Sequence, residues 1–192
     1  SRARLVAGNR RNLPIVASLW MFVVAEGLFL LGEQAVAQRL GFSLALILIT
    51  LIGGRVTPAF SRNWLTKNKR AAQIPGFGRV DAVATVLAIL AVVAWVWLPG
   101  TQVTGVLAML AGGAVGLRLL RWKVWAVADE VLLVALHGGY FWVVVSLFLL
   151  GRSALTGVVQ PVQVMHAIGA GAVGSMTLIV MMRAILGHAN RP

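Results

Sequence analysis

The sequence predicts an all-α fold, a polytopic bundle of transmembrane helices, and three observations support that prediction. Hydrophobic residues make up 59% of the chain, and its mean hydropathy of +0.89 is far above that of ordinary globular proteins. Charged residues make up only 11%, and they cluster between long apolar runs. These runs are long enough to cross a bilayer, and because lipid cannot satisfy backbone polar groups, each must be helical.

We expect about six spans in one transmembrane helical domain that covers residues 1–192. The expected spans are residues 13–37, 42–60, 81–98, 102–119, 124–150 and 161–185. None of them has the alternating pattern of an outer-membrane barrel strand. The chain begins at Ser1 and not at a methionine, so we expect residues to precede it in the natural protein.

The positions of Lys and Arg indicate how these spans are oriented. Nearly all of them fall in the leading segment, residues 61–80, residues 118–123 and the tail, whereas the other three connections carry only Arg39 and Arg152. Cytoplasmic connections are rich in Lys and Arg, so both ends of this chain are expected in the cytoplasm. The net charge of +12 then reflects topology, and no nucleic-acid partner is expected. We interpret residues 61–80 as a basic cytoplasmic loop, a solvated topology signal in preference to a dedicated anionic-lipid site.

Two acidic residues lie within the first expected span. An ionisable side chain inside hydrocarbon costs roughly 2.5–3.5 kcal/mol on insertion scales, so it needs a partner, a cavity or a function. Glu26 and Glu33 are seven residues apart and would share one helix face, with Glu26 near mid-membrane and Glu33 near the outer end. They are our candidates for a proton relay.

One histidine lies near the middle of the fifth expected span. His137 is followed by Gly138, Gly139 and Tyr140, so the helix surface beside it is bare. A neutral imidazole can ligate haem or copper, and the glycines would leave room for a flat macrocycle or for a neighbouring helix. For a lone histidine we favour the structural alternative, in which it hydrogen-bonds another helix while the glycines pack.

A second histidine, His166, lies about five residues into the sixth span, close to the outer surface and ahead of the small-residue stretch 167–174. Met165 points about 100° away around the helix, which argues against a Met–His copper pair on this span. At about 1.5 Å per residue, His137 is roughly 20 Å from the outer end of its span and His166 roughly 8 Å from that of its own. One metal ion is therefore not expected to bind both, and His188 lies beyond the cytoplasmic end of the last span.

Arg55 and Arg183 lie near the cytoplasmic ends of their spans. Two interpretations carry equal weight. The side chains extend outward to the lipid headgroups, or they pair with a haem propionate, whose carboxylate a guanidinium group can bind through two parallel hydrogen bonds.

The chain has no cysteine, which excludes disulfides, thiolate metal sites and iron–sulfur clusters. Any haem or metal must therefore be held by His, Met, Tyr or carboxylate groups.

Three stretches resemble the NnrS family. The first, residues 53–63, reads GGRVTPAFSRN and is similar to the family signature of two glycines, Arg, Pro, Phe, a hydroxyl residue, Arg and Asn at the end of a span. The second, residues 129–142, contains HGGY and then Trp142, and looks like the family's Leu-His, Gly-Tyr, Trp pattern. The third, residues 166–188, closes with a Gly-His pair. These ordered matches cover most of the chain.

The resemblance implies a haem- and copper-containing protein of the bacterial inner membrane, linked to nitric oxide metabolism and to protection from nitrosative stress. The family is expected to have about twelve spans, so this chain would be part of a larger protein. The motif matches make His137 and His166 the preferred ligands for haem or a metal, with His188 a further metal candidate and Arg55 and Arg183 as supporting groups.

Our leading hypothesis is a redox-cofactor protein in which His137 is an axial haem ligand and His166 belongs to a second haem or copper site, with nitric oxide arriving through the lipid. Whether it is an enzyme stays open, because reduction, release and sensing of nitric oxide cannot be told apart from these residues. One alternative is a proton- or ion-coupled transporter, although neither an inverted repeat nor paired broken helices are visible, and Pro58 is expected to end the second span. Another is a cofactor-free assembly subunit in which the histidines only bridge helices.

Overall fold

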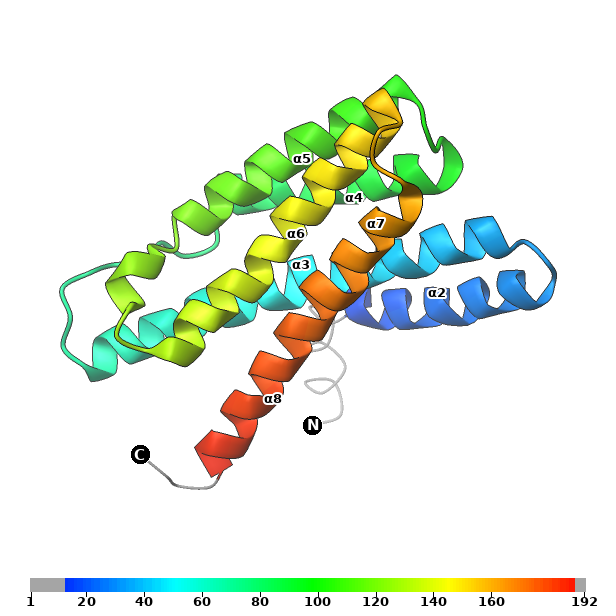
Figure 1. The fold of residues 1–192 in the computed structure, drawn as a ribbon. Helices are drawn as coiled ribbons and strands as arrows, with labels where there is room; N and C mark the ends of the chain where they lie inside the picture. Colours follow the sequence, from blue (N-terminus) through cyan, green and yellow to red (C-terminus); the bar gives the residue numbers. More distant parts are fainter. Residues whose placement is uncertain (1–12, 189–192) are drawn as a thin grey trace, which may run out of the picture.

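The computed structural model describes residues 13–188, with the side chains of residues 16–186, and confirms the all-α prediction (Figure 1). No strand occurs in this part of the chain. In chain order the elements are α2 (Leu13–Leu30), α3 (Gln34–Lys67), α4 (Arg79–Trp97), α5 (Gln102–Leu120), the 3₁₀ turn η2 (Val124–Val127), α6 (Val131–Thr156), α7 (Pro161–His166), the π-helical η3 (Ala167–Gly174) and α8 (Ser175–His188).

Five of the helical segments in the described residues are long and apolar enough to cross a membrane. They are α3, α4, α5, α6 and the continuous stretch Pro161–Leu186, which α7, η3 and α8 form together. In α2 the apolar stretch Val16–Leu30 is shorter, and α2 packs beside the first part of α3 (Figure 1). The chain is therefore a multi-pass helical membrane protein, with a span count close to the expected six.

The boundary between the first two spans lies earlier in the sequence than expected. Helix α2 stops at Leu30 and α3 starts at Gln34. Between them Gly32 has φ of +93°, a left-handed conformation that glycine adopts without steric cost and that reverses the chain. Apolar residues run on through both helices, so hydropathy alone did not mark this turn.

Helix α3 continues past Pro58, which was expected to end the second span, and reaches Lys67. The basic connection is therefore shorter than residues 61–80, since only residues 68–78 lie outside helices. The fifth expected span also begins later, because η2 and a short connection precede α6 at Val131.

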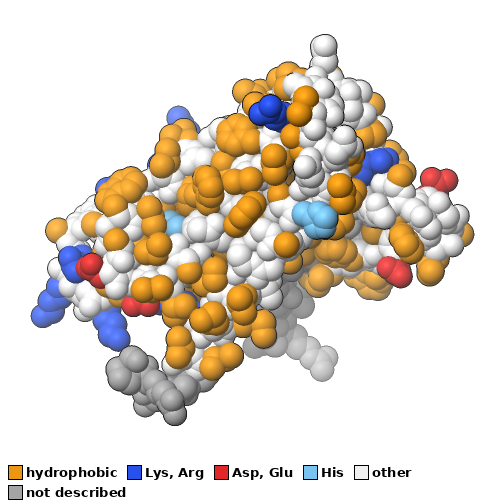
Figure 2. Space-filling model, in the orientation of Figure 1, with side chains coloured by type: hydrophobic (Ala, Val, Ile, Leu, Met, Phe, Trp, Pro, Cys, Tyr) orange, Lys and Arg blue, Asp and Glu red, His pale blue; other side chains and the backbone are white. Residues whose placement is uncertain are grey.

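Helix α5 turns small residues toward the interior of the bundle and large ones outward. On α5, Ala108, Ala111 and Val115 are fully buried, whereas Leu110 and Leu117 are more than half exposed. Figure 2 shows hydrophobic side chains spread over the visible face of the bundle. This is the arrangement of a helix bundle in lipid, where close backbone approach drives packing and the outer surface stays apolar.

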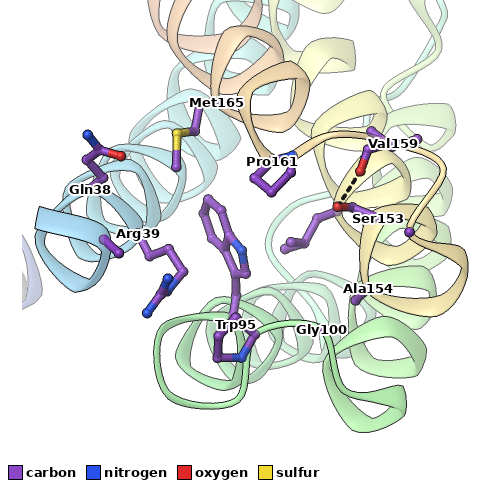
Figure 3. A pocket seen from close by; sticks show the side chains of 13 residues that line it. Gln38, Arg39, Trp95, Gly100, Ser153, Ala154, Val159, Pro161 and Met165 are labelled. Atoms are coloured by element: carbon purple, nitrogen blue, oxygen red, sulfur yellow. Dashed lines mark hydrogen bonds between the residues drawn. The ribbon is translucent and has the colours of Figure 1, made fainter.

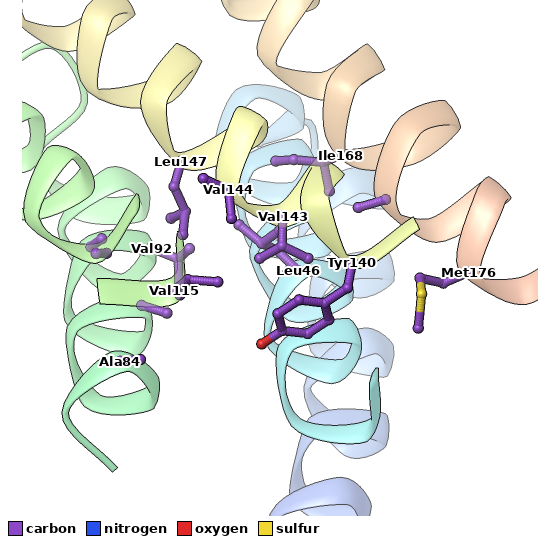
Figure 4. Packing of buried hydrophobic residues seen from close by; sticks show 14 of the residues in the cluster. Leu46, Ala84, Val92, Val115, Tyr140, Val143, Val144, Leu147, Ile168 and Met176 are labelled. Carbon is purple, nitrogen blue, oxygen red and sulfur yellow. The ribbon is translucent and has the colours of Figure 1, made fainter. Parts of the chain in front are cut away.

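Helix α6 lies at the centre of the bundle and packs against α3, α5, η3 and α8. Its Val143 and Leu147 meet Val115 of α5 and Leu46 of α3 within one buried cluster (Figure 4). Between α5 and α6 the backbones come close, since a Cβ added at Gly151 would lie 3.1 Å from the carbonyl oxygen of Gly105.

The connections gather at two ends of the bundle (Figure 1). The basic end holds residues 68–78 and 121–130, together with the end of α8. The opposite end holds the α2–α3 turn, the α4–α5 connection at residues 98–101 and the α6–α7 connection at residues 157–160. Each end contains some of the candidate site residues.

Candidate functional site

A crevice of about 420 Å³ opens at the opposite end of the bundle, and we call it the Trp95 crevice (Figure 3). It lies between the start of α3, the α4–α5 connection, the end of α6 and the start of α7. Arg39 enters it from α3 and donates a hydrogen bond from Nε to the carbonyl oxygen of Val96 at 3.3 Å. Ser153 fixes the α6–α7 connection by donating to the carbonyl oxygen of Val159 at 2.7 Å (Figure 3).

His166 lines a groove of about 550 Å³ that adjoins this crevice and shares Gln38, Pro161 and Met165 with it. We call it the His166 groove. Its other walls include Phe42 of α3 and the small residues that follow His166. The His166 side chain is exposed, so the imidazole is free to meet a ligand. Met165 lines the same groove although it was expected to point away.

The helix changes from α to π geometry directly after His166. Residues 167–174 form η3 and include three glycines, of which Gly169 packs so closely that an added Cβ would lie 3.2 Å from Phe42. Short π-helical segments inside α-helices occur frequently at functional sites. The small-residue stretch was interpreted as a packing surface, and the structure places a change of helix type there as well.

His137 is buried, with 3% of its surface exposed. Its Nδ1 lies 2.8 Å from the carbonyl oxygen of Leu133, which can only accept, so Nδ1 carries the proton and Nε2 has the free lone pair. Metal-binding histidines use this tautomer. The backbone of Trp122 interacts electrostatically with the ring, but Nε2 has no hydrogen-bond partner in the described part of the chain. The hydrogen bond is to its own helix and not to a neighbouring one.

The space beside His137 is largely occupied. The Trp122 ring stands edge-on to the imidazole, with 6.2 Å between ring centroids. Met176 of α8 covers Gly139, where an added Cβ would lie 2.9 Å from Sδ, while Gly138 faces open space. A haem at His137 would have to displace these side chains, whereas a small ion would not. The donor and its surroundings therefore fit a metal ion better than a macrocycle.

The two histidines lie toward different ends of the bundle. His137 is roughly 9 Å from the start of α6 at the basic end and not near mid-span, because α6 starts at Val131. His166 closes α7 at the opposite end. Among the described side chains, those of residues 16–186, no group of three or more His, Asp and Glu is close enough to hold a metal ion. The His188 side chain lies outside the described residues.

Glu26 and Glu33 do not share a helix face. Helix α2 ends at Leu30, so Glu33 lies in the connection as the residue before α3, and Glu26 is about one turn from the end of α2. Neither is near mid-membrane in this arrangement. Both side chains are exposed, and no ion pair of either carboxylate occurs among the described residues. The proton relay stays a prediction, without the shared face on which it depended.

The two arginines of the expected site have different surroundings at the basic end. Arg183 places Nη1 4.0 Å from Oε1 of Glu130, and its guanidinium lies 4.6 Å from the centre of the Phe60 ring. Arg55 is exposed and lines a separate crevice. Neither lies at the His166 groove.

Sequence reasoning missed a buried ion pair at the basic end. Arg118 was assigned to a basic loop and Asp81 to the start of a span, yet they are only 1% and 4% exposed. Nε of Arg118 donates to Oδ1 of Asp81 at 2.9 Å, and Nη1 donates to the Tyr140 hydroxyl at 3.0 Å. Oδ2 of Asp81 accepts from Arg121 at 3.2 Å and from the Gly78 amide at 3.0 Å. These groups join three helices, α4, α5 and α6.

Pro58 explains why Arg118 is needed inside the bundle. Proline has no N–H, so the carbonyl of Gly54, four residues earlier, loses its helical partner. Nη2 of Arg118 donates to that carbonyl at 3.0 Å, and Nη1 reaches the carbonyl of Thr50 at 3.4 Å. Gly54 makes the approach feasible, because an added Cβ would lie 2.6 Å from Cζ of Arg118. The available signal was the spacing of Gly54 and Pro58 in one span together with an arginine near the end of another.

One comparison with known proteins identifies a family. No curated protein and no solved structure matches the chain. The model of the family described as NnrS protein matches residues 2–192, essentially the whole sequence. The resemblance of residues 53–63, 129–142 and 166–188 is thereby confirmed, and the chain belongs to the NnrS family.

Proposed function

We propose that this chain is a haem- and copper-containing protein of the bacterial inner membrane that acts in nitric oxide metabolism and in resistance to nitrosative stress. Family membership supports the proposal, and the multi-pass helices are in keeping with it. The observation that carries it is His166, an exposed imidazole in a groove next to a π-helical stretch. In this proposal both ends of the chain lie in the cytoplasm, as the basic end suggests.

His166 is the residue we assign to haem. The groove offers an apolar wall at Phe42 and Met165 and a bare surface at Gly169 and Ala170, and these features suit a flat macrocycle whose iron is held by an imidazole. Haem iron, when bound, supplies a coordination site for nitric oxide. His166 would hold the iron through its imidazole, and Phe42 and Met165 would keep the surrounding surface apolar.

A haem at His166 needs a cation for its propionates, and Arg39 is placed for that role. It lines the Trp95 crevice, which adjoins the groove, and among the described residues its guanidinium makes one hydrogen bond, from Nε to the Val96 carbonyl. Arg55 and Arg183 lie at the basic end. We therefore assign the propionate role to Arg39 in preference to the two arginines expected from the sequence.

His137 is the residue we assign to a metal ion, with copper as the family's metal. It offers one buried nitrogen with a free lone pair, and further ligands would have to come from elsewhere. The same contacts favour a second candidate, the cofactor-free assembly subunit, because the hydrogen bond to Leu133 and the packing on Trp122 also suit a purely structural histidine.

The test is the reduced-minus-oxidised visible spectrum and the copper content of the purified full-length protein. His166→Ala is expected to remove or shift the haem signal, and His137→Ala is expected to lower copper content and leave the haem signal in place. His188→Ala tests the further metal candidate: an equal fall in copper content in this variant would add His188 to the copper ligands, and the haem signal is expected to stay in place. Absence of haem and copper from the unmodified protein would contradict the proposal and favour the assembly subunit.

A further inference from the structure

A second crevice, of about 450 Å³, opens at the basic end between α3 and the connection that leads into α4. We call it the basic crevice. Arg55 and Arg62 line it from the same helix, and because they are seven residues apart they lie on one face, two turns from each other. Pro75 and Phe77 of the connection form the facing wall.

The two arginines of the basic crevice lack a carboxylate partner. With the described side chains, those of residues 16–186, Arg55 makes no hydrogen bond or ion pair, and Arg62 makes only one hydrogen bond, from Nη1 to the Pro75 carbonyl at 3.3 Å. Asp81 also lines the crevice, but its carboxylate is engaged by Arg118 and Arg121. The other described acidic groups of this end are likewise engaged, Asp129 with Arg70 and Glu130 with Arg183. The crevice therefore carries a positive charge that an external anion can neutralise.

The surroundings of the crevice indicate what kind of anion it takes. Phe77 is 72% exposed although it sits in a basic connection, and Trp125 at the same end is 64% exposed. Large aromatic side chains exposed at the end of a transmembrane bundle are typical of the headgroup level of the bilayer. A ligand at this depth meets two guanidinium groups and an apolar side chain together.

We propose that the basic crevice binds the phosphate headgroup of an anionic phospholipid, with Arg55 and Arg62 on the phosphate and Phe77 against the start of the acyl chains. Guanidinium groups are suited to phosphate because they present several N–H donors in one plane. The site gives the signature residues Arg55 and Arg62 a common role at the membrane surface, and it does not depend on whether haem is bound. It replaces the interpretation of residues 61–80 as a solvated topology signal, because the fold sets Arg62 and Phe77 beside Arg55 of α3 in one crevice.

The experiment titrates the full-length protein in neutral detergent with phosphatidylglycerol or phosphatidylcholine and counts bound lipid by native mass spectrometry. Phosphatidylglycerol is expected to bind at least tenfold more tightly. Arg55→Gln should weaken phosphatidylglycerol binding about fivefold and Arg55→Gln/Arg62→Gln about thirtyfold, with phosphatidylcholine binding unchanged. Because Arg55 is exposed and makes no hydrogen bond or ion pair among the described side chains, its single variant removes charge from the crevice without breaking a polar contact of the fold.

The matched control is Lys67→Gln/Lys69→Gln, which removes the same charge from exposed residues of the same end and should change binding less than twofold. An equal loss in this control would overturn the proposal in favour of diffuse surface charge. Displacement of phosphatidylglycerol by millimolar inorganic phosphate would overturn the lipid assignment. A loss of haem absorbance in Arg55→Gln would also overturn it, because a propionate would then occupy the crevice.

Discussion

The two ends of the bundle differ in whether their polar side chains are buried and bonded to one another or line open crevices. Toward the basic end, Arg118, Asp81 and Tyr140 are buried and bonded to one another. At the opposite end, His166 and Arg39 line open crevices, and Arg39 makes a single hydrogen bond to a backbone carbonyl. The first set stabilises the helix packing, whereas the second remains free to contact a ligand.

This difference separates structural from ligand-binding roles better than depth in the membrane does. An ionisable side chain within a span is costly unless it has a partner, and Arg118 has four acceptors among the described residues. Such a residue has little capacity left for a cofactor. His166, with an exposed side chain at the edge of a π-helical segment, retains that capacity.

The largest expected effect concerns the buried pair. Arg118→Met should lower the free energy of unfolding by about 3–5 kcal/mol, because it leaves the Asp81 carboxylate buried with only Arg121 as a cation and removes the partner of the Gly54 carbonyl. Denaturant unfolding in mixed micelles measures this loss. Arg39→Met at the opposite end makes the same chemical change and should cost about 1 kcal/mol or less. Equal costs at the two positions would remove the distinction between the ends.

The next effect is smaller and concerns the close approach of helices. Gly54→Ala should lower the free energy of unfolding by about 1–3 kcal/mol, since the new methyl group must displace a guanidinium that four acceptors hold in place. Gly113→Ala in α5 is the control, because an added Cβ there meets nothing within 4 Å. Helix propensity predicts that it is neutral or stabilising by up to about 1 kcal/mol. An unchanged free energy of unfolding in Gly54→Ala would indicate that the Arg118 guanidinium can move away from this position without destabilising the fold.

The fold was predictable from the sequence because hydropathy over long runs is a strong signal. The turn at Gly32 was not predictable from hydropathy, since apolar residues continue on both sides of it. The α2–α3 boundary in turn decided the depth of Glu26, and the start of α6 decided that of His137. Small errors at helix ends thus became errors about which groups lie deep in the membrane.

The buried ion pair escaped prediction for a different reason. An arginine near the end of a span can snorkel outward or turn inward, and an amphipathic pattern would normally tell the two apart. Helix α5 is apolar on both its lipid-facing and its inward face, so no such pattern exists. Only the placement of α3 and α4 beside it shows that Arg118 turns inward, where Gly54 and Asp81 accept its hydrogen bonds.

The smallest and most specific prediction tests why the arginine is there. Pro58→Ala restores an N–H that can bond to the Gly54 carbonyl, so Arg118 is no longer its only partner. Arg118→Met should therefore cost about 1 kcal/mol less in the Pro58→Ala background than in the unmodified protein, because a buried carbonyl without a partner costs about 1–3 kcal/mol. A double-mutant cycle on the free energies of unfolding measures this coupling. If the two changes are additive, the Asp81 ion pair alone accounts for the buried arginine, and the basic end is held together by charge and not by the backbone gap at Pro58.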